Sequence, residues 1–308
     1  MKIGIDLGGS HIAIGLVNKE NKIIEKRFYY MNDRKKEDSE SYIINSIIKG
    51  INDILKSCEY NLNQIEMIGI AMPGNPKNGC IKNVVNLGIE EFNIISKLQE
   101  KLKNNSIKIM LENDGKCAAL AEKRGGALKE FKDCIFLCIG TGIGGAVFID
   151  NKLVKSKKNS GFEFGHMIIS KDGEKCKCGN KGCFEVYCSK KKFKEKMKEV
   201  LGIKEYINAS DLTKIINKNI ENKKVSELLD EYIENILVGL ANIINIFEPE
   251  AICIGGSLSH YESLIINKVR DRLEKGEYLF NKENPPKIVI AKLENEAGII
   301  GATLIDME

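Results

Sequence analysis

The stretch DCIFLCIGTGIGGAVFID, residues 133–150, decides the fold because its pattern occurs twice in the chain. An apolar, β-rich run leads into a glycine-rich turn, and a second β-rich run follows the turn. KIGIDLGGSHIAIGLVN, residues 2–18, has the same order, and a third β-rich run follows each pair, at residues 23–30 and 151–154. These patterns predict antiparallel strands around a glycine turn. Their recurrence predicts two lobes of one architecture, a repeat of plan and not of sequence.

Further strands and helices follow each pattern, which predicts an α/β protein. Residues 40–58 place isoleucine and leucine at helical spacing, so we expect an amphipathic helix there. Residues 75–88 are polar and rich in turn-forming residues, and we expect a loop. The other expected strands are residues 65–72, 107–111, 251–256 and 287–293, and the other expected helices are residues 117–123, 190–200, 226–247, 259–273 and 297–305.

The composition is that of an ordinary globular protein. The 308 residues are 43% hydrophobic and 29% charged, and the net charge of +4 gives no argument for nucleic-acid binding. No charged segment precedes an apolar leader at the N-terminus, and no apolar run is long enough to cross a bilayer. We therefore expect a cytoplasmic protein with no membrane partner, whose ten cysteines are thiols or metal ligands rather than disulfides.

The segment GFEFGHMIISKDGEKCKCGNKGCFE, residues 161–185, holds three cysteines and one of only three histidines in the chain. Three thiolates and one imidazole at close spacing suit the tetrahedral site that Zn²⁺ prefers. This predicts a structural zinc site, in which four protein ligands leave no open position for chemistry. Cys188 lies nearby in the sequence, so a site of four cysteines is the alternative. The predicted ligands are His166, Cys176, Cys178 and Cys183.

Three glycine-rich turns, Asp6–Ser10, Gly140–Gly145 and Gly255–Gly256, each follow an expected strand. Glycine lets backbone N–H groups approach phosphate oxygens, because no side chain stands in the way. The middle turn matches G-x-G-x-x-G, but a dinucleotide site needs a helix after this motif, and a β-rich run follows here. Each turn alone could be a simple hairpin. Together they favour a nucleoside triphosphate as ligand.

Acidic residues stand at the ends of two expected strands. Asp6 could hold Mg²⁺ through water, or it could cap its own turn by accepting N–H groups. Asp114 could be the base that takes a proton from a hydroxyl, or the N-cap of the helix that follows. Glu163, His166 and Glu185 flank the zinc segment, and their side chains suit a ligand with several hydroxyls.

Together these motifs resemble one family, the ROK sugar kinases of the actin-like and hexokinase superfamily of ATPases. The match covers essentially the whole chain in family order, and the EFGH and CxCGxxGCxE segments are its most specific parts. The motifs that carry it are DLGGS (6–10), ENDGKCAAL (112–120), GTGIGGA (140–146), EFGH (163–166), CKCGNKGCFE (176–185), CIGGSLS (253–259) and NEAGIIGA (295–302).

The resemblance implies a fold of two ribonuclease-H-like lobes, with a cleft between them and a structural zinc loop. The small N-terminal lobe would comprise residues 1–117, joined by the C-terminal helix at about 296–308. The large lobe would comprise residues 118–295 and would contain the zinc loop at residues 161–185.

The resemblance also implies roles for individual residues. Asp114 would be the catalytic base, and His166 is favoured over Cys188 as the fourth zinc ligand. The first turn of the family commonly reads GGTK; here Ser10 keeps the hydroxyl, whereas His11 replaces the lysine. The residues that would bind phosphate, Mg²⁺ or adenosine are Asp6, Gly8, Gly9, Ser10, Gly140, Thr141, Gly142, Gly255 and Gly256, and those that would bind the sugar are Asn86, Asn113, Glu163, His166 and Glu185.

The activity implied is ATP-dependent phosphorylation of a hexose, with Mg²⁺ as cofactor and a structural Zn²⁺. Glucose phosphorylated at its 6-hydroxyl is the first expectation, and N-acetylmannosamine, fructose and allose are alternatives. The family also includes sugar-responsive repressors that carry an N-terminal helix-turn-helix segment. Here the first strand is expected at Lys2, which disfavours that function. The expected partners are a sugar, ATP and further copies of the chain in a homodimer or homotetramer.

Overall fold

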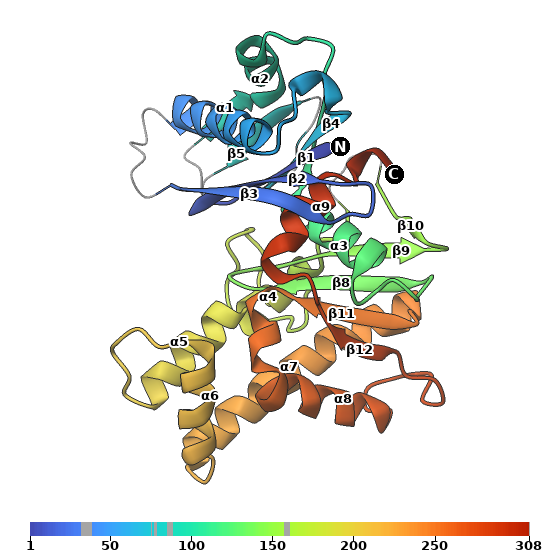
Figure 1. Ribbon diagram of the computed structural model, residues 1–308. Helices are drawn as coiled ribbons and strands as arrows, with labels where there is room; N and C mark the ends of the chain where they lie inside the picture. The colour runs from blue at the N-terminus through green and yellow to red at the C-terminus, as the bar shows by residue number, and fades with distance from the viewer. Residues whose placement is uncertain (32–38, 75, 77–78, 85–88, 157–160, 308) are drawn as a thin grey trace. The chain divides into compact units, whose positions relative to one another are not determined.

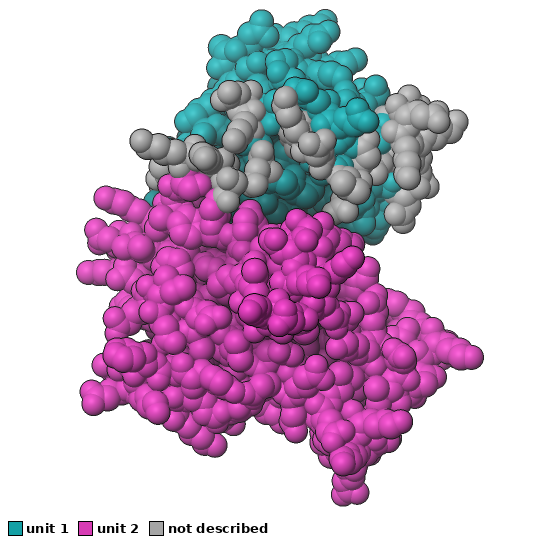
Figure 2. Space-filling view, turned by 180° about the vertical axis from the view of Figure 1, so that it is seen from behind, with its two compact units in different colours: residues 1–129, 293–308 teal, residues 130–292 magenta. Residues whose placement is uncertain are grey.

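Two five-stranded sheets share one strand order, one in each of the two units into which the chain divides (Figures 1 and 2). Unit 1 comprises residues 1–129 and 293–308, and unit 2 comprises residues 130–292. The division at residue 129 keeps the helix α3 (Asp114–Gly125) whole, whereas the boundary expected after residue 117 would cut it. The computed structural model describes residues 1–31, 39–74, 76, 79–84, 89–156 and 161–307.

The sheets confirm the predicted repeat of architecture. The order is β3-β2-β1-β4-β7 in unit 1 and β10-β9-β8-β11-β12 in unit 2. In each unit the first three strands are antiparallel, and the last two lie parallel to the first. The strands are β1 (Lys2–Leu7), β2 (His11–Val17), β3 (Ile23–Tyr30), β4 (Met67–Met72), β7 (Lys108–Asn113), β8 (Cys134–Ile139), β9 (Ile143–Ile149), β10 (Lys152–Leu153), β11 (Ala251–Gly255) and β12 (Lys287–Ile290).

Amphipathic helices cover the sheets because each presents an apolar stripe that only burial can remove from water. In unit 1, Gly50 of α1 faces Ile14 of β2 and Tyr29 of β3, so this helix lies directly on the sheet. The helices of unit 1 are α1 (Ser39–Ser57), α2 (Ile94–Leu102), α3 and α9 (Ala297–Ala302); those of unit 2 are α4 (Phe184–Cys188), α5 (Lys190–Val200), α6 (Ala209–Lys218), α7 (Lys223–Phe247) and α8 (Asn267–Glu274).

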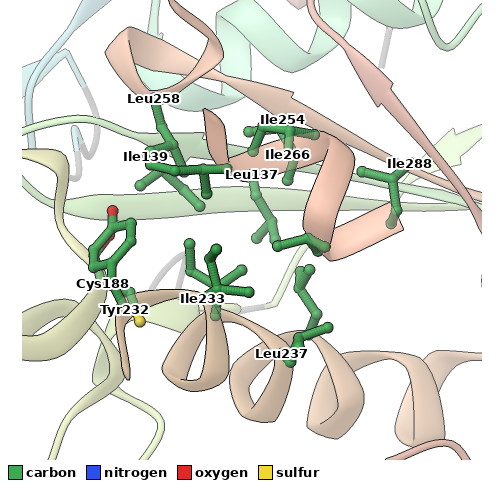
Figure 3. Close-up of a cluster of buried hydrophobic side chains, with 14 of the residues drawn as sticks. Leu137, Ile139, Cys188, Tyr232, Ile233, Leu237, Ile254, Leu258, Ile266 and Ile288 are labelled. Carbon is green, nitrogen blue, oxygen red and sulfur yellow. The ribbon is translucent and has the colours of Figure 1, made fainter. Parts of the chain in front are cut away.

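The core of unit 2 forms where the long helix α7 crosses its sheet. Figure 3 shows Ile233 and Leu237 projecting from α7 toward Leu137 of β8, with Ile254 of β11 in the same cluster. All four side chains are buried. The isoleucine and leucine stripe that predicts this helix is therefore its core-facing side. Within the described residues, no helix is both long and apolar enough to cross a bilayer.

Two of the predicted segments take a different form in the structure, and α2, α4 and α6 are helices that the sequence analysis did not predict. The segment expected as a loop, residues 75–88, contains the strand β5 (Cys80–Val84), which pairs with β6 (Ile89–Asn93) just beyond it; Val84, Ile89 and Phe92 of this hairpin are buried. The helix expected over residues 259–273 begins as a 3₁₀ turn (Gly256–Tyr261) and a π turn (Glu262–Ile266) before α8. Ser259 donates a hydrogen bond to the Gly256 carbonyl at 2.7 Å, which keeps the first turn tight.

The backbone of α9 lies so close to β1, β4 and α3 that no side chain fits between them. A Cβ atom added to Gly4 of β1 would collide with the carbonyl oxygen of Ile299, and one added to Gly69 of β4 with that of Ala302. On its other side, a Cβ atom added to Gly301 would collide with the carbonyl oxygen of Cys117 in α3. Glycine at these positions therefore lets α9 lie backbone to backbone against the sheet and against α3.

We expect Gly69→Ala to destabilise the protein by about 1–3 kcal/mol, because α9 must move away from β4 to admit the methyl group. Gly125→Ala is the matched control, because nothing lies within 4 Å of a Cβ atom added at this helical glycine. This control should leave stability unchanged or raise it by about 0.5–1 kcal/mol, as alanine does in a helix. Thermal and urea denaturation measure both; equal stability of the two variants would contradict this packing.

Candidate functional site

The predicted site residues of unit 1 gather at one edge of its sheet. Asp6 of β1 is in register with Ala71 of β4, and Ala71 is in register with Glu112 of β7. These three strands are parallel, so their carboxyl ends meet at this edge, where open α/β sheets place their ligands. The chain turns from β7 directly into α3 here, and Asp114 is the first residue of that helix.

Asn113, not Asp114, caps the helix α3. The side-chain oxygen of Asn113 accepts a hydrogen bond from the Lys116 N–H at 3.2 Å, and its amide donates to the Gly74 carbonyl at 3.1 Å. The Asp114 carboxylate accepts from the N–H of Gly115 at 2.8 Å. The N-cap role that was open for Asp114 is therefore filled by its neighbour, and the base role of Asp114 stays a prediction.

Asp6 and Asp114 lie near enough for the charge of one to act on the other. Burial first, and then the charge of Asp114, raise the pKa of Asp6 from its ordinary 3.8 to about 6, although His11 acts to lower it. The Asp114 residue reaches solvent, yet enough protein surrounds its carboxyl that burial raises its pKa as well, against the lowering effect of the Gly115 N–H. This edge of the sheet thus concentrates negative charge that a cation would stabilise.

The first glycine turn closes the hairpin between β1 and β2. The Gly8 N–H donates to the His11 carbonyl at 2.9 Å, and Gly9 and Ser10 form the exposed tip. The Ser10 hydroxyl lies 3.1 Å from Nδ1 of His11. The predicted hairpin is therefore present, and its exposed tip remains open to a ligand.

Gly298 of α9 is a site residue whose role the sequence did not reveal. A Cβ atom added there would lie 2.5 Å from Cγ of Asp6. The NEAGIIGA motif was recognised as part of the family pattern, but nothing in it indicates that its glycine lies behind this carboxylate.

The predicted phosphate turns of unit 2 also meet at one edge of a sheet. The turn Gly140–Gly142 follows β8 and is closed by a hydrogen bond of 2.8 Å from the Gly140 N–H to the Gly142 carbonyl, with Thr141 exposed. Gly255 of β11 is in register with Cys138 of β8. Gly256 has a φ of +71°, which glycine adopts freely, and a Cβ atom added there would lie 2.8 Å from the Ile139 carbonyl oxygen.

Ile143 joins this glycine turn to the predicted sugar residues of the same unit. The carboxylate of Glu185, in the first turn of α4, accepts the Ile143 N–H at 2.8 Å, and a Cβ atom on Gly142 would lie 2.5 Å from it. A Cβ atom on Gly165 would collide with the Ile143 carbonyl oxygen. The turn from Glu163 to His166 and the carboxylate of Glu185 therefore converge on the start of β9.

The four predicted zinc ligands lie together. One ligand atom from each of His166, Cys176, Cys178 and Cys183 lies within 4.8 Å of the others. The Sγ atoms of Cys178 and Cys183 are 3.6 Å apart, and Sγ of Cys176 is 3.7 Å from Nδ1 of His166. Tetrahedral Zn²⁺ with bonds of about 2.0–2.3 Å separates its ligand atoms by about 3.5–3.8 Å, so the donor set fits this metal.

Cys188 does not join this cluster. It ends α4 in the core of unit 2, where Figure 3 shows it beside Tyr232, and its carbonyl accepts the Tyr232 hydroxyl at 2.8 Å. The arrangement supports His166 over Cys188 as the fourth ligand. Asn86, the remaining predicted sugar residue, lies outside the described residues.

The zinc segment is also tied to the helices beside it. The Glu174 N–H donates to the Tyr187 hydroxyl at 2.7 Å, and the Glu174 carboxylate pairs with Lys192 of α5 at 2.9 Å. A Cβ atom on Gly182 would collide with the Ser170 carbonyl oxygen. The contacts of Glu174 hold the segment against α4 and α5, and the close approach of Gly182 to Ser170 joins two parts of the segment itself.

We expect the stability of Asp6→Asn relative to the natural protein to depend on pH in Mg²⁺-free buffer. The raised pKa of Asp6 means that its protonated form is favoured in the folded state, so its contribution to stability is complete below about pH 4 and is lost as the pH rises through about 6. The variant should be more stable by about 1–3 kcal/mol at pH 8 and equal at pH 4. Asp230→Asn, at an exposed position of α7, is the control; an equal difference at both pH values would contradict this reasoning.

We expect Cys183→Ser to lose most of the bound zinc, because it removes one of the four ligands of a tetrahedral site. Cys188→Ser should keep the zinc content of the natural protein. Mass spectrometry of metal content per chain measures both. Loss of zinc from Cys188→Ser with full content in a His166→Ala variant would instead establish the four-cysteine site.

The chain matches the ROK family model over residues 2–307. The xylose repressor of Caldicellulosiruptor bescii is 30% identical over 97% of this chain and 76% of the repressor. The glucokinase of Thermotoga maritima is 26% identical over 99% of this chain and 97% of the enzyme. The structure of a ROK family glucokinase from Streptomyces griseus in complex with glucose and AMPPNP matches with a TM-score of 0.73 at 25% identity, over 98% of this chain and 97% of that one. With two α/β units of one strand order, the chain belongs to the ROK family and has the fold of its sugar kinases.

Proposed function

We propose that the protein is an ATP-dependent sugar kinase that phosphorylates a hexose, with Asp114 as the general base. The observation that carries this proposal is the position of Asp114. Its carboxylate stands at the carboxyl edge of the unit 1 sheet, next to Asp6, and it does not serve as the helix cap. A carboxylate that does not cap the helix, and that accepts the Gly115 N–H through one oxygen, has acceptor capacity left for proton transfer.

Asp114 would accept the proton of the sugar hydroxyl that attacks the terminal phosphoryl group of ATP. Burial raises the pKa of this carboxyl toward the working pH, which favours a group that must both take up and release a proton. The Gly115 N–H, 2.8 Å away, fixes the direction of the carboxylate. In phosphoryl transfer, such positioning supplies much of the catalysis.

The glycine turns would hold the nucleotide. Gly8, Gly9 and Ser10 in unit 1 and Gly140, Thr141 and Gly142 in unit 2 would donate N–H and hydroxyl groups to phosphate oxygens, while Gly255 and Gly256 would face adenosine. Bound Mg²⁺ would neutralise charge on the phosphates, and Asp6 would hold it through water. The raised pKa of Asp6 supports this role, because a cation at this place would relieve the repulsion between two carboxylates.

Glu163, His166, Glu185, Asn113 and Asn86 would bind the hydroxyls of the sugar. The cluster of His166 and three cysteines would hold a structural Zn²⁺ that orders the segment carrying the first three of these residues. The contact between Glu185 and the Ile143 N–H supports a direct link between sugar binding and the glycine turn that precedes Ile143.

We propose glucose, phosphorylated at its 6-hydroxyl, as the first substrate to test, and N-acetylmannosamine, fructose and allose as alternatives. Similarity to the glucokinase of Thermotoga maritima supports this order. The family resemblance favours a homodimer or homotetramer as the working form.

A sugar-responsive regulator without kinase activity is the second candidate. Its support is the 30% identity with the xylose repressor of Caldicellulosiruptor bescii. A regulator of this kind would bind a sugar without releasing ADP from ATP.

We expect Asp114→Asn to fold, to bind sugar with unchanged affinity and to lower kcat by about 10²–10⁴, because it removes the proton acceptor and keeps the shape. The measurement is ADP release in a coupled assay with ATP, Mg²⁺ and each of the four sugars, with calorimetry for sugar binding. Asp230→Asn, far along the chain on α7, is the matched control and should keep full turnover.

Two outcomes of this assay would contradict the proposal. Turnover of Asp114→Asn at the level of the natural protein would remove Asp114 from the base role. Sugar binding by the natural protein without ADP release from any of the four sugars would favour the regulator.

A further inference from the structure

The side chain of Glu122 in α3 is fully buried, and its carboxylate binds one segment that follows α3 directly and one far along the chain. One oxygen accepts the Ala127 N–H at 2.7 Å, and the other accepts the Leu293 N–H at 2.7 Å. Burial of a carboxylate is costly unless hydrogen bonds compensate it, and bonds to an ionised acceptor are about twice as strong as neutral ones. The two hydrogen bonds therefore offset the cost of burying the Glu122 carboxylate.

The two N–H groups flank both places where the chain passes between the units. The chain leaves unit 1 after Lys129 and returns to it at Leu293. Ala127 precedes the departure by two residues, and Leu293 is the first residue after the return. One carboxylate thus fastens both connections. The farther of its two partners, Leu293, lies 171 residues from Glu122 in the sequence.

The first connection is wrapped closely around Glu122. The N–H groups of Gly126 and Leu128 both donate to the Glu122 carbonyl, at 3.0 and 3.1 Å. A Cβ atom on Gly126 would collide with the Glu122 carboxylate. The backbone and side chain of this one residue therefore set the path of the chain as it leaves α3.

Beyond Lys129 the same connection is fastened again, by a residue of unit 2. The Glu250 carboxylate accepts the N–H of Asp133 at 3.0 Å and also that of Lys132. The second connection is shorter, because Ala291 still pairs with β11 through a 3.0 Å bond to the Ile254 carbonyl. Only a few residues of each connection lie between these anchors.

The anchor also reaches the predicted catalytic base through one helix. Asp114 begins α3 and Glu122 lies two turns further along it. The close approach of Gly301 to the Cys117 carbonyl holds the helix between them against α9. A shift of the connections would therefore be transmitted along a rigid element to Asp114.

We propose that Glu122 is a positioning residue that fastens both connections between the units to the helix carrying Asp114, so that the two connections move as one. The part of this inference that concerns turnover rests on the proposed kinase function; the part that concerns the connections does not. A role in ending α3 would account for the bond to Ala127 but not for the bond to Leu293.

Amide hydrogen exchange of Glu122→Gln tests the fastening. Glutamine keeps the size of the side chain but offers only one acceptor oxygen, so one of the two N–H groups faces an NH₂ donor. Because the connections are expected to move as one, both segments, residues 126–133 and 288–296, should exchange about tenfold faster. If only one segment changes, the bonds are independent, and the proposal is wrong.

Glu66→Gln is the matched control, because Glu66 is an exposed partner of the N-terminal ammonium in the same unit. It should leave the exchange of both segments and the turnover unchanged. If Glu122→Gln does not fold, Glu122→Asp keeps the charge but is too short to reach both N–H groups. The same joint loss of protection is then expected, and protection of both segments as in the natural protein would refute the fastening.

Kinetics of the same variants test the positioning. In Glu122→Gln, kcat should fall about tenfold while KM for ATP and for the sugar changes less than about twofold, as for a residue that acts on the reacting geometry. Faster exchange of both segments with unchanged kcat would overturn the positioning role. Absence of any turnover in the natural protein would refute the kinase function, and the exchange experiment would still decide whether Glu122 fastens the connections.

Discussion

The close approach of α9 to β1, β4 and α3 is the constraint on which unit 1 depends. A packed helix normally stands off from a sheet by the length of its side chains, and here glycines at both surfaces remove that distance. The consequence is electrostatic as well as steric. Gly298 lies against Asp6, so this carboxyl has backbone behind it and Asp114 nearby, and its pKa rises to about 6. The contact that holds α9 in place therefore also buries the Asp6 carboxyl, with which a cation would interact.

In unit 2 the predicted site residues are positioned by a different kind of interaction. Its zinc segment is mostly exposed and has few apolar side chains, so hydrophobic burial alone offers little to order it. The cluster of one histidine and three cysteines would supply a cross-link with Zn²⁺ bound, and the ion pair of Glu174 with Lys192 adds a second attachment. The segment contacts Ile143 at the start of β9 through Glu185 and Gly165, so ordering the segment would also fix these contacts.

The sequence predicted the parts of this fold whose signals are local. The β-rich runs around Gly8 and Gly140 formed the expected antiparallel strands, and the apolar stripe of α7 became its buried side. Residues 75–88 were expected to be a loop because polar and turn-forming residues outnumber the apolar ones there, whereas β5 within this stretch pairs with β6. The role of Asp114 was open between base and helix cap, because aspartate suits both, and only the geometry shows that Asn113 caps α3. Glu122 had no sequence signal at all, since one of its partners lies 171 residues away. The roles of the site residues remain predictions.

The discontinuous path of unit 1 has a consequence for synthesis on the ribosome. Residues 130–292 are contiguous, so unit 2 can complete its sheet as soon as they emerge. Unit 1 begins first but must wait for α9, whose backbone packs directly against Gly4 and Gly69 of its sheet. The nascent chain thus carries an incomplete first unit whose helix α9 is translated only after all of unit 2. The surface around Asp6, against which Gly298 of α9 lies, is therefore completed only after unit 2 has been translated.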